Sequence, residues 1–492
     1  MQNRLIRQTC SWLLIGLLLG CGAWMLFAHV GEDEFGHGDE PRHGINAYEM
    51  AQSGNYIVTT FEGEPDYWNL KPPLSTWSML LGYKVFGYNA LGMRFYSPAS
   101  MFGVMVILAV WLRRRYGTGA AVLCQLFLIA CTVLYRDHFA RYGDADAQLV
   151  LFYTIAMLCM MESCRDPRWL YGSALCFGLA FMTKSWHAVL IPLTCFVFVC
   201  VTGVIRRLRV RHYLLLIFFG LLPILPWALL RVQYDGLTFF RKALSVDVVK
   251  RATTVVEGHT GEWYAYLKWF KQDKAILLAL GLSALTLLAM AIRRKGPTRD
   301  QWGAALWFAV PMVFYSLCVS KLLWYVCVCV PSIALLLAMN WTVLRDAVLQ
   351  LKWKKFACAA LAVIFLASSA LLGLWGVQNA RNVAATQNTD EVQLLLERHF
   401  DRSRNPGERV YVDYEVMPWW PDIDYKEWIF DEQVCALLLG DVSCQYGGLQ
   451  AFEADEERAW LIAHQSTLAP DTLDKWACVD TEGAWYLLHN GR

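Results

Sequence analysis

Long apolar segments alternate with short polar connections along most of this chain. A helix needs about 20 apolar residues to cross the hydrocarbon core of a membrane. By that measure the sequence contains eleven candidate transmembrane helices, at residues 11–30, 90–112, 118–136, 147–163, 169–186, 188–205, 213–233, 275–292, 301–319, 322–344 and 356–377. The first follows Arg4 and Arg7, as a signal peptide would, but it is long and lacks a clear small-x-small cleavage site, so we expect a retained helix.

The composition supports this class of protein. Hydrophobic residues make up 57% of the 492 residues and charged residues only 17%, whereas a soluble protein of this length carries more charge. The pattern therefore predicts an all-α polytopic membrane protein. The net charge of +2 gives no indication of a nucleic-acid partner. Most of the sixteen cysteines lie in apolar segments, where they behave as small hydrophobic residues, and no CxxC motif suggests a metal site.

The positions of the positive charges predict the orientation of the chain. Clusters of arginine and lysine occupy alternate connections, at 113–115, 165–168, 206–211, 293–299 and 345–355. By the positive-inside rule these connections are cytoplasmic. The opposite, outer side then holds the loop 31–89, the link 137–146, the loop 234–274 and the tail 378–492.

The tail differs in composition from the rest of the chain. Alternating apolar and polar residues at 409–413 and 484–488 predict strands. The two expected domains are a transmembrane domain, 1–377, and a small soluble α/β or α+β domain, 378–492. Cys435, Cys444 and Cys478 would face an oxidising compartment, so one disulfide is expected among them, with all three pairings open.

The outer loop 31–89 concentrates acids, histidines and Lys71 beside the membrane. Apolar helices do not need such a loop in order to fold, so we expect it to form the catalytic face of a membrane enzyme. Its stretches 43–52 and 74–86 are amphipathic and rich in Tyr, Trp and Met. Such segments are typical of juxtamembrane helices that lie at the membrane interface.

An acidic pair, Asp39 and Glu40, lies in the middle of this loop. Taken alone, the pair has a simple structural interpretation. Asp39 precedes Pro41, and an Asp followed by Pro in the first turn is a common signature of a helix N-terminus.

A second acidic pair, Asp144 and Asp146, lies at the outer end of the segment 147–163. A carboxylate at such a helix end is costly unless it has a partner or a role. An ion pair with Arg136 or Arg141 is the simple structural interpretation. Two acidic pairs on one face instead favour sugar chemistry, because positive charge develops on the anomeric carbon and a hydroxyl acceptor must lose a proton.

Several cations also lie on the outer side. Lys71 is followed by two prolines, which fix the backbone after it. Arg251, Lys321 and Tyr325 lie at or near the outer ends of other segments. Together these groups can neutralise a lipid-linked phosphate at the membrane surface. The structural alternative is that they only anchor helices at the interface.

Seven motifs carry a resemblance to a known family. They are Asp39-Glu40-Pro41-Arg42, Tyr48-Glu49-Met50, Gly63-Glu64-Pro65, Lys71-Pro72-Pro73-Leu74, the stretch 178–184, Leu225-Pro226-Trp227 and Ser320-Lys321-Leu322. In this order, over residues 1–345, they resemble the GT-C glycosyltransferases, and best the bacterial aminoarabinose transferase branch, which is related to the protein O-mannosyltransferases. The resemblance implies a GT-C fold with about 11–13 transmembrane helices. It also implies transfer of a sugar from a polyprenyl-phosphate carrier at the outer face of a bacterial inner membrane, with the C-terminal domain in the periplasm.

The resemblance further implies roles for individual residues. The family's first-loop Asp falls on Asp39, with Glu40 beside it. Its second outer-face Asp precedes a Leu by three residues and a Phe by six, and it falls on Asp146. The lysine and tyrosine that lie by the carrier phosphate fall on Lys71 and Tyr325. Arg251 and Lys321 are further candidates for the phosphate, and Arg42, Asp144, Lys184 and His259 are further candidates for the site.

The expected function is therefore that of an inverting glycosyltransferase. Its partners are a polyprenyl-phosphate-linked sugar donor, the membrane, and a lipid or glycan acceptor, with lipid A favoured. We expect no required cofactor; a divalent metal is possible but unsupported, because Leu70 stands where the family often has Glu. Two alternatives stay open. A protein O-mannosyltransferase shares the first-loop chemistry, and a transporter or flippase of lipid-linked sugars would place its polar residues near the midplane in repeated halves.

Overall fold

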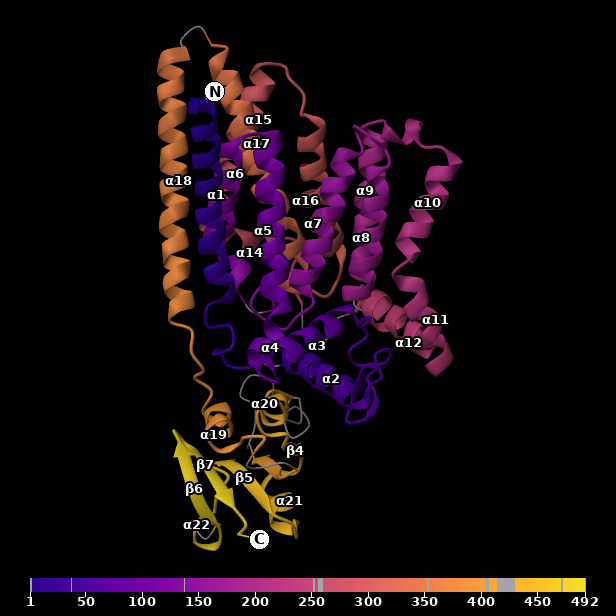
Figure 1. Cartoon of the computed structure of the whole chain (residues 1–492), viewed down its shortest axis with the longest axis vertical. Helices are drawn as coiled ribbons and strands as arrows, with labels where there is room; N and C mark the ends of the chain where they lie inside the picture. Colours follow the sequence, from indigo (N-terminus) through magenta and orange to yellow (C-terminus); the bar gives the residue numbers. More distant parts are fainter. Residues whose placement is uncertain are drawn as a thin grey trace.

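The computed structural model shows a bundle of long helices above a small sheet domain, with short helices between them (Figure 1). It describes every residue except 1, 37, 137, 251–252, 255–259, 352–353, 404–406, 414–429, 470–471 and 492. The main helices of the bundle are α1 (Gln2–Phe27), α5 (Tyr96–Arg115), α6 (Thr118–Ala130), α7 (Asp146–Glu162), α8 (Trp169–Lys184), α9 (Leu190–Val201), α10 (Val210–Leu221), α11 (Ile224–Asp235), α15 (Lys274–Ile292), α16 (Arg299–Leu317), α17 (Val330–Leu349) and α18 (Lys354–Ala384). Short 3-10 segments join them, at η1 (Thr132–Tyr135), η2 (Ser185–Val189), η3 (Val204–Arg207) and η5 (Leu323–Cys329).

Each of the eleven predicted segments coincides with a helix or with a broken helix pair. Within the described residues, six helical segments are long and apolar enough to cross a membrane by themselves, or seven if α10 and α11, bent by 52°, form one span. Helix length explains part of the difference between the eleven predicted segments and these six or seven, since α6 has 13 residues and α7 has 17. The chain is thus a membrane protein with several spans, as predicted.

One of those six segments, Trp169–Val201, combines two predicted spans. The guanidinium of Arg207, just after α9, donates hydrogen bonds to the carbonyls of Cys164 and Arg165, just before α8, at 2.8 and 2.9 Å. The chain has therefore returned to the side from which α8 started. We conclude that α8 and α9 form two passes, joined by η2 at the outer end.

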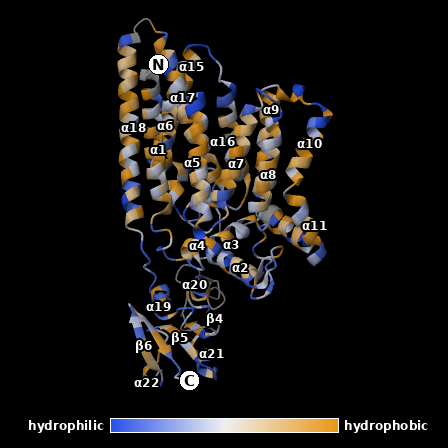
Figure 2. Cartoon of the chain, viewed as in Figure 1, coloured by the Kyte–Doolittle hydropathy of each residue, from blue (hydrophilic) through white to orange (hydrophobic). Residues whose placement is uncertain are grey.

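Burial separates the helices of the core from those that face lipid. In the apolar window of Leu323–Leu349, 83% of residues are buried, whereas only 17% are buried in that of Lys355–Ala384. Apolar side chains also remain exposed along α10 and α15. Lipid covers such a surface in a membrane, and Figure 2 shows the apolar residues over the bundle with polar residues toward its ends.

Short elements cover the outer end of the bundle. They are α2 (Asp39–Ser53), β1 (Thr60–Phe61), β2 (Glu64–Pro65), α3 (Leu74–Phe86), α4 (Ala90–Arg94), α12 (Thr238–Ala243), η4 (Leu244–Lys250) and α14 (Ala265–Lys271). The predicted amphipathic stretches 43–52 and 74–86 correspond to α2 and α3, which lie across this end in Figure 1. Asp39 does not cap α2: the cap position is Gly38, in a conformation with φ 83°, and Asp39 is the first helical residue.

The tail folds around a five-stranded sheet. Its elements are α19 (Glu391–His399), β3 (Arg409–Asp413), α20 (Phe430–Gly440), β4 (Ser443–Gln445), α21 (Gly448–Ala454), β5 (Ala459–His464), α22 (Thr472–Lys475), β6 (Ala477–Glu482) and β7 (Trp485–His489). The strand order is β4-β3-β5-β7-β6, with β4, β3 and β5 parallel and β7 antiparallel to both β5 and β6. The predicted division at 377/378 falls inside α18, which continues to Ala384.

The expected disulfide of the tail is not formed. All sixteen cysteines are free, Cys435 and Cys444 within the core and Cys478 on the exposed strand β6.

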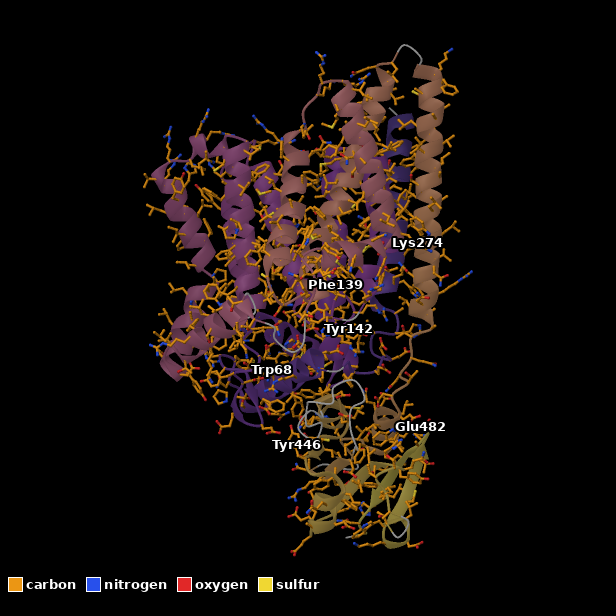
Figure 3. All side chains as sticks on the ribbon, turned by 180° about the vertical axis from the view of Figure 1, so that it is seen from behind. Trp68, Phe139, Tyr142, Lys274, Tyr446 and Glu482 are labelled. Carbon is orange, nitrogen blue, oxygen red and sulfur yellow. The ribbon has the colours of Figure 1, made fainter. Side chains whose placement is uncertain are left out.

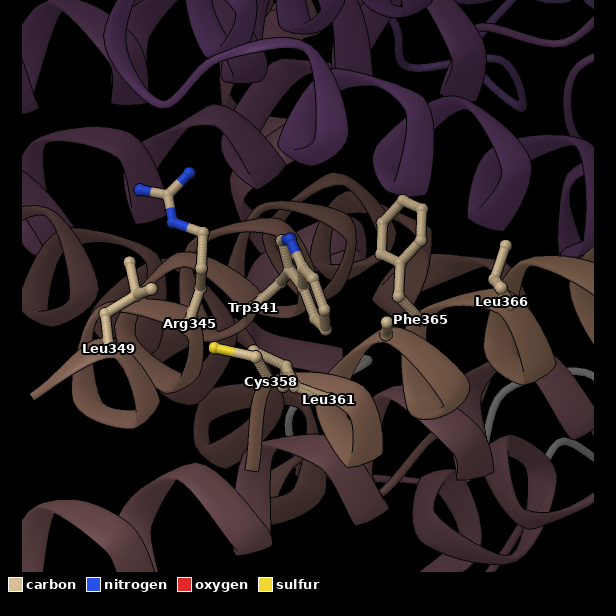
Figure 4. Close-up of a pocket in the computed structure, with 8 residues that line it drawn as sticks. Trp341, Arg345, Leu349, Cys358, Leu361, Phe365 and Leu366 are labelled. Carbon is tan, nitrogen blue, oxygen red and sulfur yellow. The ribbon is translucent and has the colours of Figure 1, made fainter. Parts of the chain in front are cut away.

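A separate groove of about 380 Å³ lies between α17 and α18, lined mostly by apolar side chains such as Trp341 and Phe365 (Figure 4). Arg345 is its one charged lining residue. None of the predicted site residues lines this groove.

Candidate active site

Glu40 is held from all sides beneath the outer loop. The guanidinium of Arg94 donates to both of its carboxylate oxygens, at 2.7 and 2.8 Å, and both side chains are 1% exposed. The backbone N–H groups of Gly36 and Gly143 donate to it as well, at 2.9 and 2.6 Å. A carboxylate with four such donors joins three segments of the chain. These contacts favour a structural role for Glu40 over the predicted catalytic one.

Asp39, one residue earlier, remains accessible. Its carboxylate oxygen lies 3.8 Å from the ammonium of Lys71, and the two side chains are 26% and 17% exposed. Burial is the largest single influence on the pKa of Asp39 and raises it, but Lys71 and the neighbouring histidines together lower the pKa below its usual value. Asp39 is therefore ionised at neutral pH, beside a cation that still reaches solvent.

His43 lies one helical turn after Asp39 and hence on the same face of α2. Its Nε2 is 2.9 Å from the ammonium of Lys71, and its Nδ1 is 3.2 Å from a carboxylate oxygen of Asp144. This imidazole therefore connects the predicted phosphate-binding lysine to the link 138–145. Asp39, Lys71 and Asp144 converge from three separate segments.

Asp144 accepts a second histidine on its other oxygen. The Nδ1 of His138 lies 2.7 Å from that oxygen, and the imidazole ring stacks on Trp324 with 4.1 Å between the ring centroids. His138 itself has φ 61°, a backbone conformation that few non-glycine residues adopt. The structural alternative, an ion pair with Arg136 or Arg141, is not what Asp144 forms: its two oxygens pair with His43 and His138, and the guanidinium of Arg141 donates to the carbonyl of Met25 at 2.8 Å.

These hydrogen bonds set the charges of Asp144 and His138. Burial alone would raise the pKa of Asp144, but the hydrogen bonds from His138 and His43 lower it well below its usual value. Burial alone would lower the pKa of His138, but its hydrogen bond with Asp144 and the negative charges of the nearby carboxylates together raise the pKa to about 9. Asp144 is thus an anion and His138 a cation at neutral pH.

Asp39, His138 and Asp144 place one ligand atom each within 4.8 Å of one another, and they form the one group of this kind among the described residues. Two carboxylates and an imidazole fit a divalent cation by donor type. The two oxygens of Asp144 are, however, already paired with imidazoles, and Lys71 lies beside Asp39. The carboxylates are thus neutralised by groups of the protein itself.

Asp146, at the start of α7, forms a buried ion pair with Lys184 at the end of α8. The ammonium of Lys184 also lies 5.5 Å from the ring centroid of Tyr325. Asp146 interacts electrostatically with Asp144 and Lys71, so the two acidic positions belong to one site. In Figure 3, Phe139 and Tyr142 mark the link 138–145, where the bundle meets the outer elements.

Lys321 does not point into this site. Its ammonium donates to the carbonyls of Tyr315 at 3.1 Å, Ser316 at 2.8 Å and Cys318, at the end of α16. A lysine in this position satisfies the last carbonyls of a helix and neutralises its negative end. The geometry therefore favours a structural role for Lys321 over the predicted phosphate contact.

Arg42 also has a partner of its own. Its guanidinium donates twice to the carboxylate of Asp66, at 2.9 and 3.0 Å, and lies over the rings of Phe61 and Trp68. This contact fixes the loop that leads from β2 to Lys71. Arg42 supports the site from outside rather than entering it.

Two predicted residues, Arg251 and His259, lie outside the described residues. Conversely, His43 and His138 were not predicted as site residues, yet both contact the predicted acid Asp144, and His43 also contacts Lys71. For His43 a signal was present, since it follows Asp39 by four residues and begins the predicted amphipathic stretch 43–52. No pattern in the sequence singles out His138.

Comparison with known proteins agrees with the predicted resemblance. Residues 70–229 match the family described as dolichyl-phosphate-mannose-protein mannosyltransferase. Two relatives in Pseudomonas fluorescens strain Pf0-1 are undecaprenyl phosphate-alpha-4-amino-4-deoxy-L-arabinose arabinosyl transferases 2 and 1. The first is 27% identical over 65% of this chain and 58% of its own length, and the second 28% identical over 78% and 66%. The chain thus spans about three-fifths of the length of these relatives.

Two solved structures have the same fold. They are those of ArnT from Cupriavidus metallidurans in the apo state, with a TM-score of 0.71 and 17% identity, and bound to undecaprenyl phosphate, with a TM-score of 0.65 and 18% identity. Each match covers at least 97% of this chain and 98% of the other. The predicted fold class is confirmed, and in both sequence and fold the chain is similar to the aminoarabinose transferases among the GT-C glycosyltransferases.

Proposed function

We propose that this chain, a GT-C glycosyltransferase of the aminoarabinose transferase type, moves a sugar from a polyprenyl-phosphate carrier to an acceptor at the outer face of the inner membrane. Lipid A or another cell-envelope glycan is the proposed acceptor. The observation that carries the proposal is the position of Lys71: a half-buried ammonium beside the ionised Asp39, at the outer end of a membrane bundle. The relatives are named for undecaprenyl phosphate, and a neighbour with the same fold binds it.

In the proposed reaction the bond between the anomeric carbon and the phosphate oxygen of the carrier breaks. Negative charge then grows on the leaving phosphate, and Lys71 stabilises it. Positive charge develops on the sugar, and the carboxylates of Asp39 and Asp146 are placed to stabilise it or to orient the acceptor. The acceptor attacks from the opposite face in a single displacement, which inverts the anomeric configuration.

The state of Asp39 bears on the kind of acceptor. A hydroxyl must lose its proton during the attack, and a carboxylate with a lowered pKa is a weak base for that step. A phosphate on a lipid is already ionised and needs no base. The site therefore favours a phosphate acceptor over the side-chain hydroxyl that a protein O-mannosyltransferase would use. A transporter is not favoured, because the acids and lysines of the site lie at the outer end of the bundle, at the start of α2, the start of α7 and the end of α8, rather than at the midplane.

We place the outer face, and with it the C-terminal domain, in the periplasm. The basic connections lie at the opposite end of the bundle, which the positive-inside rule assigns to the cytoplasm. No cofactor enters the proposed reaction, since the carrier phosphate is its own leaving group.

The test of the proposal is mass spectrometry of lipid A and of surface glycans from cells with and without the gene. We expect a mass that corresponds to one added sugar to disappear from lipid A, or from another envelope glycan, when the gene is deleted. Identical lipid and glycan profiles in the two strains, under conditions in which the protein is produced, would contradict it.

A further inference from the structure

We propose that His43 is a positioning residue for Lys71: its neutral imidazole holds the ammonium toward the carrier phosphate and keeps it from pairing directly with Asp144. The inference rests on the proposed function. It concerns a residue to which neither the motifs of the sequence nor the relatives assign a role.

The direction of the hydrogen bonds fixes the state of His43. An ammonium only donates, so the Nε2 that lies 2.9 Å from the Lys71 nitrogen must accept. The imidazole is then neutral and carries its proton on Nδ1. That nitrogen lies 3.2 Å from Asp144, whose carboxylate only accepts. Two neighbours of opposite charge therefore select the same tautomer of His43.

The far end of this chain of hydrogen bonds is also fixed. Asp144 accepts from His138, which stacks on Trp324, so its carboxylate cannot turn away from His43. The hydrogen-bonded series Lys71–His43–Asp144–His138 thus joins four groups, each with a defined donor or acceptor role. Asp144 is 1% exposed, whereas the side chain of Lys71 is 17% exposed. The anchored end is buried, and the ammonium at the other end is accessible.

The charges explain why an imidazole is useful at this position. Lys71 and His138 are cations, and Asp39 and Asp144 are anions, so the four charges balance. The ammonium makes its hydrogen bond with the neutral ring and lies 3.8 Å from Asp39, beyond hydrogen-bond distance. Among the residues that the structure describes, the ammonium has no other hydrogen-bond partner, so two of its three N–H groups are left for a phosphate. Without His43, a direct ion pair with a carboxylate would compete with the lipid phosphate for this charge.

The experiment compares variants of the full-length protein in detergent, with undecaprenyl phosphate as the binding probe. His43→Phe keeps a ring but removes both nitrogens, and we expect it to weaken undecaprenyl phosphate binding by about tenfold, since a hydrogen bond to a charged group contributes on that scale. The same loss should raise the KM for the lipid donor more than it lowers kcat. The matched control is His399→Phe, which breaks a 2.7 Å contact of a histidine with Asp480 in the tail, and it should bind as the wild type does.

A double-mutant cycle separates positioning from a merely structural role. If His43 acts through Lys71, His43→Phe has no further effect on binding once Lys71→Met is present. His43→Gln keeps an acceptor near the Nε2 position and should retain more binding than His43→Asn, which keeps only a donor to Asp144. This pair tests the inference even if His43→Phe fails to fold.

Two results would overturn the role of His43: wild-type binding by the Phe variant, or full additivity with Lys71→Met. A wild-type protein that neither binds undecaprenyl phosphate nor transfers sugar would instead contradict the proposed function itself.

Discussion

Gln393 and Phe35, 358 positions apart, exchange two hydrogen bonds. The backbone N–H of Phe35 donates to Oε1 of Gln393 at 2.8 Å, and Nε2 of Gln393 donates to the carbonyl of Phe35 at 3.1 Å. The side-chain amide of Gln393 thus makes the two backbone hydrogen bonds that a neighbouring strand would make with Phe35, in the segment that leads to Asp39. Nearby, the hydroxyl of Tyr48 on α2 donates to Asp441 at the end of α20. The tail is therefore packed against the helix that carries the site.

We expect Gln393→Leu to loosen this segment. The substitution nearly preserves volume but leaves a buried N–H and a buried carbonyl of Phe35 unpaired, which costs about 1–3 kcal/mol for each group. The free energy of unfolding should fall, and amide exchange should rise in residues 31–36 more than in the bundle. A suitable control is Gln445→Leu, because the side chain of Gln445 donates a hydrogen bond to Ser443 on the same strand, β4, away from Phe35. Equal exchange in both variants would show that the contact does not hold the loop.

Much of the fold follows from the sequence because one physical requirement dominates it. Crossing a membrane demands a continuous apolar helix, and this demand is local, so all eleven segments were predictable. The breaks inside these segments were not predictable from hydropathy. The bend between α10 and α11 falls at Pro223, just before α11, and a hydropathy pattern does not encode it.

The site was predictable only in part, because a residue type does not reveal its partner. Lys71 and Lys321 both follow the expected pattern, yet one reaches solvent beside Asp39 while the other bonds to helix carbonyls. Glu40 and Asp39 are neighbours in sequence, but only Glu40 meets Arg94, which comes from α4. Such partners are brought together by tertiary packing and cannot be read from spacing.

Asp39→Asn should abolish transfer while the protein still folds. Asp39 is partly exposed at the start of α2, so its loss leaves no buried partner unsatisfied, in contrast to Glu40. Losing a positioned base or carboxylate typically costs about 10²–10⁴-fold in rate. The measurement is sugar transfer by the purified variant, with its unfolding temperature as the control for folding. Near-normal turnover would remove Asp39 from the mechanism.

The orientation of the chain predicts two reporter results. A reporter that is active only in the periplasm should be active when fused after Arg492 and silent when fused after Arg211. The reason is the excess of arginine in the connection at 206–211. The opposite pattern would move every proposed catalytic residue to the cytoplasmic side.

The pair of His138 and Asp144 predicts a pH dependence of stability. The pKa of His138 is raised from 6.5 to about 9 in the folded protein, so its pairing stabilises fully below pH 6.5 and is lost as the pH rises through about 9. The free energy of unfolding should therefore decline between these values. His138→Gln should show a shallower decline in a chemical denaturation series over this range. A wild-type slope that matches the variant's would mean that the pair contributes nothing.

The last prediction concerns Lys71 and the lipid donor. A charge-assisted hydrogen bond to phosphate contributes about 1.5–3 kcal/mol, or roughly 10–150-fold in binding. Lys71→Met keeps the apolar stem and removes the charge, so it should weaken binding of undecaprenyl phosphate by that factor. Lys71→Arg should retain part of the binding, because the charge survives but the fork geometry differs.

The control for Lys71 is Lys84→Met, an exposed lysine in the last turn of the outer helix α3, which should bind as the wild type does. It separates a phosphate contact from simple anchoring at the membrane interface, where any lysine would serve. The low effective dielectric of the half-buried site is the reason that Lys71 should matter more than Lys84. If Lys71→Met and Lys84→Met bind the carrier equally well, the lysine only anchors the loop, and the phosphate is held by other groups of the outer face.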